Sequence, residues 1–240
     1  MKHLNSISFG FVITFVLAAA AQAQVNYAIS GNTAYVTNSP YAAGDIVIAS
    51  NYKGFPVTSI GDGAFNDCAN LTSVAIPSSV ISIKESAFGY CYSLTSVTIP
   101  SSVISIGEYA FGFSGLTSVT IPNSVTDLGI GCFYDCTDLT NATIGNSVTS
   151  IGYETFWSCT SLTDVTIGES VTNIGQGAFD ECASLANVMI GNSVANIGQS
   201  AFYACYALAS VTIPGSTTNI VDGNFSDCPS LTNITAEFTH

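Results

Sequence analysis

The stretch Leu94 to Gly115, LTSVTIPSSVISIGEYAFGFSG, recurs with variations from Leu71 to the end of this 240-residue chain. One of its phenylalanines recurs every 23 residues, except for a single step of 22 residues between Phe111 and Phe133. The full column is Phe65, Phe88, Phe111, Phe133, Phe156, Phe179, Phe202 and Phe225. A fixed period of this length is typical of stacked repeats, in which each unit covers the apolar face of its neighbour. The sequence therefore predicts a solenoid.

The repeat pattern LxxVxIPxSVxxIGxxAFxxC divides into two halves with different periods. In Leu94–Ile99 the apolar residues alternate with Ser96 and Thr98, which is the pattern of a short strand. In the second half, Ala110 and Phe111 lie at a spacing that suits about one helical turn. We expect the strands to stack as one parallel sheet, with short helical or 3-10 turns on the other side.

The first 56 residues do not follow the repeat. Residues 1–23 are typical of a signal peptide, with a basic start, the apolar run Phe9–Ala21 and small residues before a cleavage point that we predict after Ala23. The apolar run is shorter than the roughly 20 residues that span a bilayer, so no transmembrane segment is expected in the mature chain. Residues 24–56 alternate with period two around a turn at Ser30–Thr33, which predicts an N-terminal β cap on an array at 57–240.

The charge of the chain restricts its partners. It has 16 acidic residues, three lysines and no arginine, so its formal net charge is −13. Nucleic-acid binding depends on Lys and Arg side chains that neutralise phosphates, so nucleic acid is excluded as a partner. Hydrophobic residues make up 48% of the chain and charged residues only 8%, which predicts a long buried core.

The column order of the repeat from Leu71 to Asn233 resembles the BspA-like, or Treponema pallidum-type, leucine-rich repeat family. The leader segment from Tyr27 to Phe65 is similar to the N-terminal cap of such proteins. The resemblance implies a right-handed leucine-rich-repeat solenoid with a concave parallel β-sheet. It also implies a secreted or surface protein that binds host, matrix or neighbouring-cell molecules.

Cysteines occupy one column of the repeat, with Ser114 at the missing position and Cys132 outside it. The column is Cys68, Cys91, Cys136, Cys159, Cys182, Cys205 and Cys228. Eight cysteines in an exported protein would usually indicate disulfides. We expect free, buried thiols instead, because the thickness of a helical turn should hold successive repeats beyond the reach of a disulfide. Metal binding by Cys132 and Cys136 is the alternative, but no His lies near them in the sequence.

The sequence offers little for catalysis. After removal of the leader its only His is His240, so acid–base chemistry would depend on carboxylate pairs such as Asp180 with Glu181. These acids recur in a few columns and are more simply the solvated rim of each coil. We therefore expect a protein that is not an enzyme and binds neither a cofactor nor a metal.

Two surfaces remain as candidates for recognition. The outward residues of the strands form a polar face that offers hydrogen bonds to a protein or a glycan, although Ser and Thr are also ordinary residues of a solvated strand. Its candidate binding residues are Ser96, Thr98, Ser118, Thr120, Asn141, Thr143, Asp164, Thr166, Asn187 and Thr212. The alternative is an aromatic edge beside the Cys column, where Tyr134, Trp157 and Tyr203 are the candidate residues. These aromatic residues could equally cover the core of the coil.

Three functions follow from these surfaces. The first is a secreted or cell-surface interaction protein that binds an extracellular protein or glycan. The second is a structural role with end-to-end self-association, because the last strand of an array presents an open edge. The third is an ice-binding surface formed by the regular Ser-x-Thr lattice.

Overall fold

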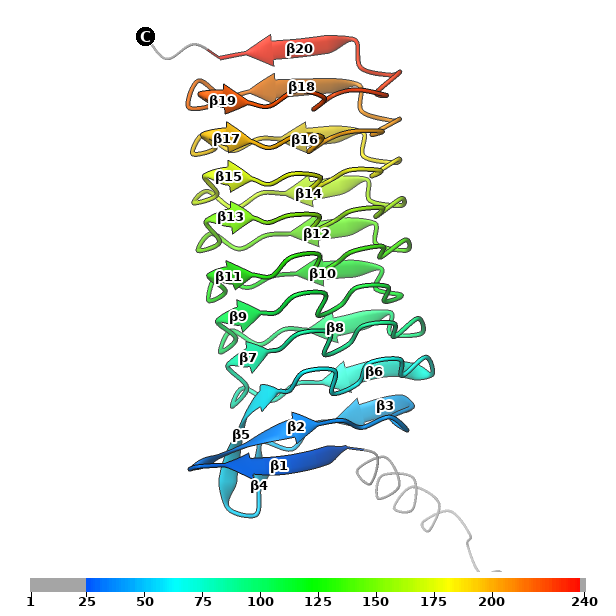
Figure 1. The fold of residues 1–240 in the computed structure, drawn as a ribbon, viewed down its shortest axis with the longest axis vertical. Coiled ribbons are helices and arrows are strands. Elements are labelled where there is room, and N and C mark those ends of the chain that lie inside the picture. Colours follow the sequence, from blue (N-terminus) through cyan, green and yellow to red (C-terminus); the bar gives the residue numbers. More distant parts are fainter. Residues whose placement is uncertain (1–24, 238–240) are drawn as a thin grey trace, which may run out of the picture.

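The computed structural model describes residues 25–237 of the chain, and these residues form a single column of stacked coils (Figure 1). The column begins at an N-terminal hairpin and ends at strand β20. The predicted leader, residues 1–23, lies outside the described residues, and so does His240. Each coil contains two short strands and one segment made of turns.

The first strand of each coil comes from the SVT segment of the repeat, and these strands pair in parallel in two sheets. One sheet is β3 (Gly44–Val47), β6 (Leu71–Ala75) and β8 (Ser96–Thr98). The other is β10 (Ser118–Thr120), β12 (Asn141–Thr143), β14 (Asp164–Thr166), β16 (Asn187–Met189), β18 (Ser210–Ile213) and β20 (Asn233–Ala236). The break between β8 and β10 falls in the repeat that is one residue shorter, where Gly115 donates its backbone N–H to Cys91.

A second ladder of parallel strands, which the sequence did not predict, runs beside the first. It consists of β5 (Phe55–Ile60), β7 (Ser82–Ile83), β9 (Ser105–Ile106), β11 (Asp127–Leu128), and then β13 (Ser150–Ile151), β15 (Asn173–Ile174), β17 (Asn196–Ile197) and β19 (Asn219–Ile220). These strands have only two residues in most coils, too few for alternation to stand out in the sequence. Register across coils defines them, as in the pairing of Ile151 with Ile174.

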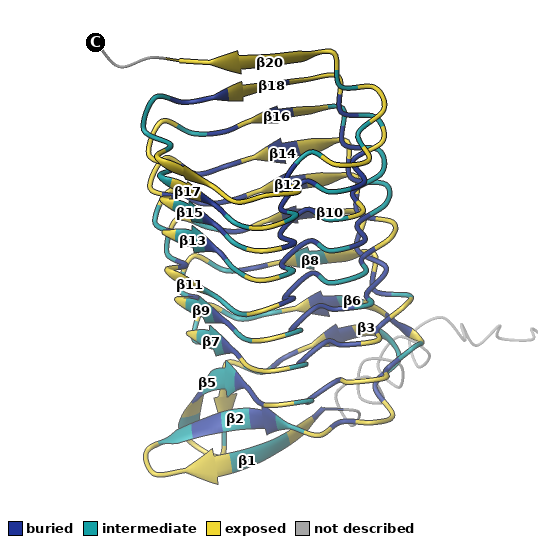
Figure 2. Ribbon diagram, turned by 45° about the horizontal axis from the view of Figure 1, so that its top comes forward, coloured by how far each residue is buried: buried dark blue, intermediate teal, exposed yellow. Residues whose placement is uncertain are grey.

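The core lies inside the coils and consists of the repeated apolar columns. Figure 2 shows buried residues on the inward side of the coils and exposed residues on the outward side. Consecutive phenylalanines of the column stack from Phe65 to Phe225, with ring centroids 5.2 to 5.7 Å apart. Such stacked rings bury large apolar areas and also gain ring–ring attraction. The column therefore contributes strongly to stability.

The predicted helical turns are absent, because the residues that the structure describes contain no helix. The AFxxC segment instead pairs with the next coil: Phe156, for example, donates its N–H to Ala178, and Ser158 donates its N–H to Asp180. Two columns, two residues before and two residues after each phenylalanine, have positive φ in every coil. This alternation turns the N–H groups toward the neighbouring coil, so intercoil hydrogen bonds replace those of a helix.

The reason that we gave for free thiols is also wrong, because the close stacking of the phenylalanines shows that the turns of successive coils lie near one another. The cysteines are free all the same. A different contact accounts for their placement. Each column thiol from Cys91 onward donates to the carbonyl oxygen of the column phenylalanine in the preceding coil, 3.1 to 3.3 Å away.

The N-terminal cap has the hairpin that the sequence predicted. Strands β1 (Asn26–Ser30) and β2 (Thr33–Thr37) pair antiparallel, and β4 (Asn51–Tyr52) pairs with the start of β5. Strand β2 then pairs in parallel with β5, so the predicted boundary between residues 56 and 57 falls inside a strand. The cap thereby continues the second ladder directly.

Candidate binding faces

The outward residues of the first ladder form a continuous polar surface, which we call the strand face. All ten residues predicted for it are exposed. They occupy the first and third positions of β8, β10, β12 and β14, the first position of β16 (Asn187) and the third position of β18 (Thr212). The residue between these two positions in each strand points into the core. Register places Ser118, Asn141 and Asp164 side by side, and Thr120, Thr143 and Thr166 side by side. The structure thus brings the predicted residues together in two parallel rows.

A third row of hydroxyl groups lies just before these strands and is tied to the backbone. Thr140 Oγ1 donates to the carbonyl oxygen of Thr117, at 2.9 Å, and Thr163 Oγ1 donates to that of Thr140, at 3.2 Å. Thr163 also donates to Asp164 Oδ2, at 2.7 Å. These bonds fix the side chains of the third row, and Asn141 and Asp164 of the strand face also bond to it, because Asn141 Nδ2 donates to Thr140 Oγ1 at 2.9 Å.

Carboxylates are rare on this face, which carries only Asp45 and Asp164. Thr72 and Ser73 donate to Asp45 Oδ1, at 2.8 and 2.7 Å, and these hydrogen bonds, with Ser73 the larger cause, lower the pKa of Asp45. The face is therefore almost neutral, in contrast to the chain as a whole.

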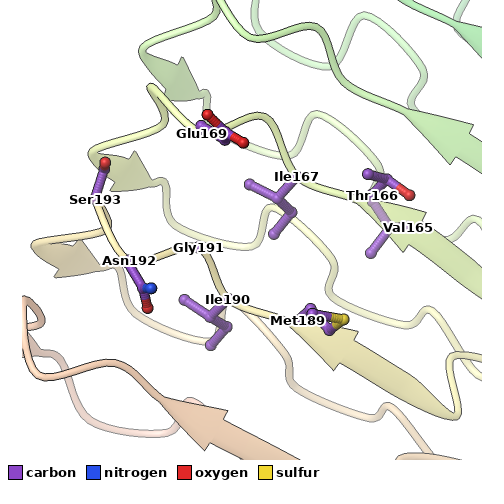
Figure 3. A pocket seen from close by; sticks show the side chains of 9 residues that line it. All are labelled: Val165, Thr166, Ile167, Glu169, Met189, Ile190, Gly191, Asn192 and Ser193. Carbon is purple, nitrogen blue, oxygen red and sulfur yellow. The ribbon is translucent and has the colours of Figure 1, made fainter. Parts of the chain in front are cut away.

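Met189 interrupts the threonine row, and its side chain is 83% exposed. It lies at the rim of a hollow of about 490 Å³ beside the ends of β14 and β16, which Figure 3 shows from close by. Ile167 and Ile190 lie side by side in this hollow, next to Glu169 and Asn192. The prolines that end this segment in some other coils are replaced here by Gly168 and Gly191, and Gly191 lines the hollow. The polar strand face thus has an apolar margin.

The aromatic edge is a stack of rings on the turn side of the coils. Tyr90 stacks on Phe113, at 4.5 Å between ring centroids, Phe113 contacts Tyr134 at 5.3 Å, and Tyr134 stacks on Trp157 at 4.5 Å. Tyr203 is separate from this stack, because Asp180 occupies the intervening coil. Its hydroxyl group donates to Asp227 Oδ2, at 2.6 Å. The structure therefore joins two of the three predicted aromatic residues and leaves the third apart.

Most of the acidic residues lie on this same turn side. Ten of the 16 are within three positions of a column phenylalanine: Asp62, Asp67, Glu85, Glu108, Asp135, Glu154, Asp180, Glu181, Asp222 and Asp227. Among them, Asp180 has a buried oxygen, Oδ1, without a hydrogen-bond partner. Burial, and then the charges of Glu181 and Glu154, raise the pKa of Asp180 to about 6. The strand face and the turn side thus differ sharply in charge.

The cysteines lie behind the turn side and are poor nucleophiles. Burial raises the pKa of Cys91 to about 12 and that of Cys136 to about 11. A thiol is reactive as its thiolate, so these groups are suited to packing. Within residues 25–237, no group of three or more His, Cys, Asp or Glu side chains is arranged to hold a metal ion.

A stack of parallel strands with leucine and phenylalanine columns inside and a broad polar face outside defines a leucine-rich repeat protein. The family described as BspA type Leucine rich repeat region matches in six copies, over residues 58–182 and 149–239. The chain belongs to this family.

The chain is similar to several solved structures, and two of them share its fold. A leucine-rich repeat protein from Bacteroides ovatus is 22% identical with a TM-score of 0.53, over 89% of this chain and 75% of that one. The pneumococcal vaccine antigen PcpA is 17% identical with a TM-score of 0.61, over 89% of this chain and 69% of that one. A leucine-rich repeat protein from T. pallidum is 26% identical with a TM-score of 0.48, over 90% and 81%. No sequence among the curated proteins matches the chain.

Residues 25–237 contain no helix that is long and apolar enough to cross a membrane.

Proposed function

We propose that the chain is an exported interaction protein that binds an extracellular protein or glycan through the strand face. The observation that carries the proposal is the register of its two exposed rows, for example Thr120 beside Thr143 and Thr143 beside Thr166. Adjacent strands are about 4.8 Å apart, so the rows present hydrogen-bonding groups at regular intervals on a rigid surface. A preorganised surface loses little conformational entropy when it binds.

The chemistry of the strand face favours binding over catalysis. Its side chains are hydroxyl and amide groups with few carboxylates, and such groups donate and accept hydrogen bonds without titrating near neutral pH. Met189, which is 83% exposed at the margin of this face, adds a flexible apolar side chain on which an apolar part of the partner can pack. Export to the cell surface or the medium is part of the proposal, and it rests on the leader-like sequence of residues 1–23.

The test is an array of glycans and extracellular matrix proteins probed with the wild type and with Thr120→Lys/Thr143→Lys. The matched control is Thr126→Lys/Thr149→Lys, which places two lysines in the same coils on exposed threonines outside the strand face. We expect the first variant to lose at least tenfold in affinity for any ligand found, and the control to bind as the wild type does. Equal binding by all three proteins would refute the strand-face assignment.

A second candidate is end-to-end self-association through the last coil. Ile220, Val221 and Ile234 are 45%, 40% and 55% exposed, whereas the isoleucine of the preceding β17 and the valine of β18 are buried. All four residues of β20 are exposed, as Figure 2 also shows. An open strand edge beside exposed apolar side chains favours the addition of another chain. Sedimentation at several concentrations tests this proposal, with Ile234→Lys as the variant that should stay monomeric. A wild type that also stays monomeric at every concentration would exclude the association.

A further inference from the structure

On the turn side, four aromatic side chains surround a hollow of about 320 Å³. Tyr90, Tyr109, Phe113 and Tyr134 line it together with Ser86, Gly89 and Gly112. Tyr109 meets Tyr134 edge to face, at 5.6 Å between centroids and an interplanar angle of 66°. Tyr90 and Phe113 form a second wall and stack against one another, with 4.5 Å between ring centroids and an interplanar angle of 6°. Rings therefore bound the hollow on more than one side.

Glycines open the hollow. The position after the column phenylalanine carries Tyr134 and Trp157 in later coils but Gly89 and Gly112 in these two. A third glycine makes room for the wall, because a Cβ atom at Gly131 would lie only 2.5 Å from Cε1 of Tyr109. Without side chains at Gly89 and Gly112, the aromatic rings face an empty space instead of packing against a neighbour.

Three of the aromatic residues stand in two columns whose backbone has positive φ in every coil. Tyr90, Tyr109 and Phe113 have φ values of 59°, 49° and 59°, in the left-handed region that bulky residues rarely adopt. The column of Tyr109 carries glycine in some other coils, such as Gly63 and Gly177. The column of Tyr90 and Phe113 carries non-glycine residues in every coil. The left-handed backbone is thus a feature of every coil, and it is the aromatic side chains that distinguish these two coils from the others.

The charge around the hollow is negative. Burial and then the Glu154 carboxylate raise the pKa of Tyr109, and the same two causes come first for Tyr134. Glu154 is thus close enough to both rings to act on their hydroxyl groups. Glu108 adds a smaller effect on Tyr109, and Asp135 a smaller effect on Tyr134.

We propose that this hollow binds the cationic side chain of a lysine or arginine presented by a basic segment of a protein partner. Aromatic faces attract cations through the ring quadrupole, and several rings around one charge strengthen the attraction. The carboxylates of Glu154 and Glu108 add long-range attraction, and the acidic residues repeated along the turn side extend it over neighbouring coils. The same carboxylates repel phosphate, which disfavours nucleic acids and phospholipid headgroups. The site is distinct from the strand face, so either proposal can fail without the other.

Trp157 provides a direct readout, because it is the only tryptophan of the chain and stacks on Tyr134 at 4.5 Å. The full chain is titrated with Nα-acetyl-lysine amide and a lysine-rich heptapeptide. Nα-acetyl-norleucine amide is the neutral control of the same shape, and methyl glucoside tests a sugar ring. We expect a saturable change in Trp157 fluorescence with both cationic probes, tighter for the heptapeptide and weaker at high salt. The neutral probes should give no saturable change.

Two variants localise the binding. Gly112→Tyr fills the hollow with the residue that the same column carries at Tyr134, and an added Cβ meets only ordinary contacts, the nearest at 3.5 Å from Tyr109. It should lower affinity at least tenfold. Glu154→Gln keeps the shape of the site and should lower affinity about threefold or more. Tyr41→Ser, at an 85% exposed tyrosine of the cap, should bind as the wild type does.

The proposal is overturned if no cationic probe binds, if norleucine amide binds as tightly as lysine amide, or if Gly112→Tyr retains its affinity. Saturable binding of methyl glucoside without lysine amide would assign the hollow to a neutral glycan instead. Circular dichroism of each variant establishes whether it is folded. If Gly112→Tyr does not fold, Glu154→Gln still tests whether the carboxylate contributes to binding of the cationic probes.

Discussion

The thiol of Cys159 donates a hydrogen bond to the carbonyl oxygen of Phe133 in the preceding coil, with 3.2 Å between sulfur and oxygen. The same bond recurs at Cys182, which donates to Phe156 at 3.2 Å. Both thiols are fully buried. The Cys column therefore links adjacent coils through the carbonyl groups of the Phe column, without any covalent bond.

Replacement of Cys159 by alanine should lower the free energy of unfolding by about 1–2 kcal/mol, because it removes a buried sulfur and leaves a carbonyl oxygen without this donor. Cys228→Ala is the matched control, since Cys228 is only half-buried in the last coil. It should cost less than half as much. Urea unfolding measures both values, and a cost at Cys228 equal to that at Cys159 would contradict this explanation.

Thiol labelling should distinguish Cys228 from the other seven cysteines. Seven thiols are buried, and desolvation raises the pKa of those such as Cys91, to about 12, so little thiolate is present at pH 8. A maleimide reagent should therefore modify Cys228 first in the folded protein, and all eight thiols only in denaturant. Rapid modification of several thiols in the native state, counted by mass spectrometry, would show that the column is accessible.

Phe156→Ala should destabilise the protein by about 3–5 kcal/mol, because it opens a cavity in the middle of the ring stack. Phe156 contacts both Phe133 and Phe179, at 5.3 Å between centroids in each case. Phe225 stacks on one side only, with Phe202, and is half-buried. Phe225→Ala should thus cost clearly less, and equal losses in denaturant unfolding would argue against a uniform stack.

Two glycines of one column should respond differently to alanine. At Gly168 a Cβ atom would collide with the carbonyl oxygen of Gly145, so Gly168→Ala should lower the free energy of unfolding by about 2 kcal/mol. At Gly191 the nearest atom, the carbonyl oxygen of Gly168, is 3.9 Å away. Gly191→Ala should therefore change stability by at most about 1 kcal/mol, in the stabilising direction, by restricting the unfolded chain. Thermal unfolding of the two variants measures the difference in stability, and equal effects at Gly168 and Gly191 would contradict this explanation.

Asp180 should make stability depend on pH. Burial, as the main cause, raises its pKa in the folded protein from 3.8 to about 6, so the folded state binds more protons than the unfolded state between these values. The contribution of Asp180 to the free energy of unfolding is then highest at low pH and falls as the pH rises from about 4 to about 6. Because the group is partly solvated, we expect an effect on the order of 1 kcal/mol.

Asp180→Asn should remove this contribution and make the protein more stable than the wild type at pH 8, while the two differ less at pH 4.5. Asp138→Asn, at an exposed residue two coils away, is the control for the change in net charge. If both variants gain the same stability at pH 8, general charge repulsion and not the burial of Asp180 is the cause.

The sequence by itself determined the architecture and the polar face. The period of 23 residues assigned the Phe, Leu and Ile columns to one core, because such columns are stable only when coils cover one another. The same alternation placed Thr120 and Thr143 on the outside of the strands, where the structure has them. The hairpin of the cap was also predictable from local turn residues.

Only the tertiary structure decided how the coils join and where the aromatic residues meet. The second ladder, with strands as short as Ser150–Ile151, exists through pairing between coils and leaves almost no local pattern. The turn at Phe156 was expected to be helical, but its N–H groups bond to the next coil, which local spacing does not reveal. The hollow beside Tyr109 depends on Gly112 and on Tyr134, and Tyr134 lies more than twenty residues further along the chain than Tyr109. Local spacing records which side chains a repeat contains, whereas contacts between coils decide which backbone groups pair and which spaces stay open.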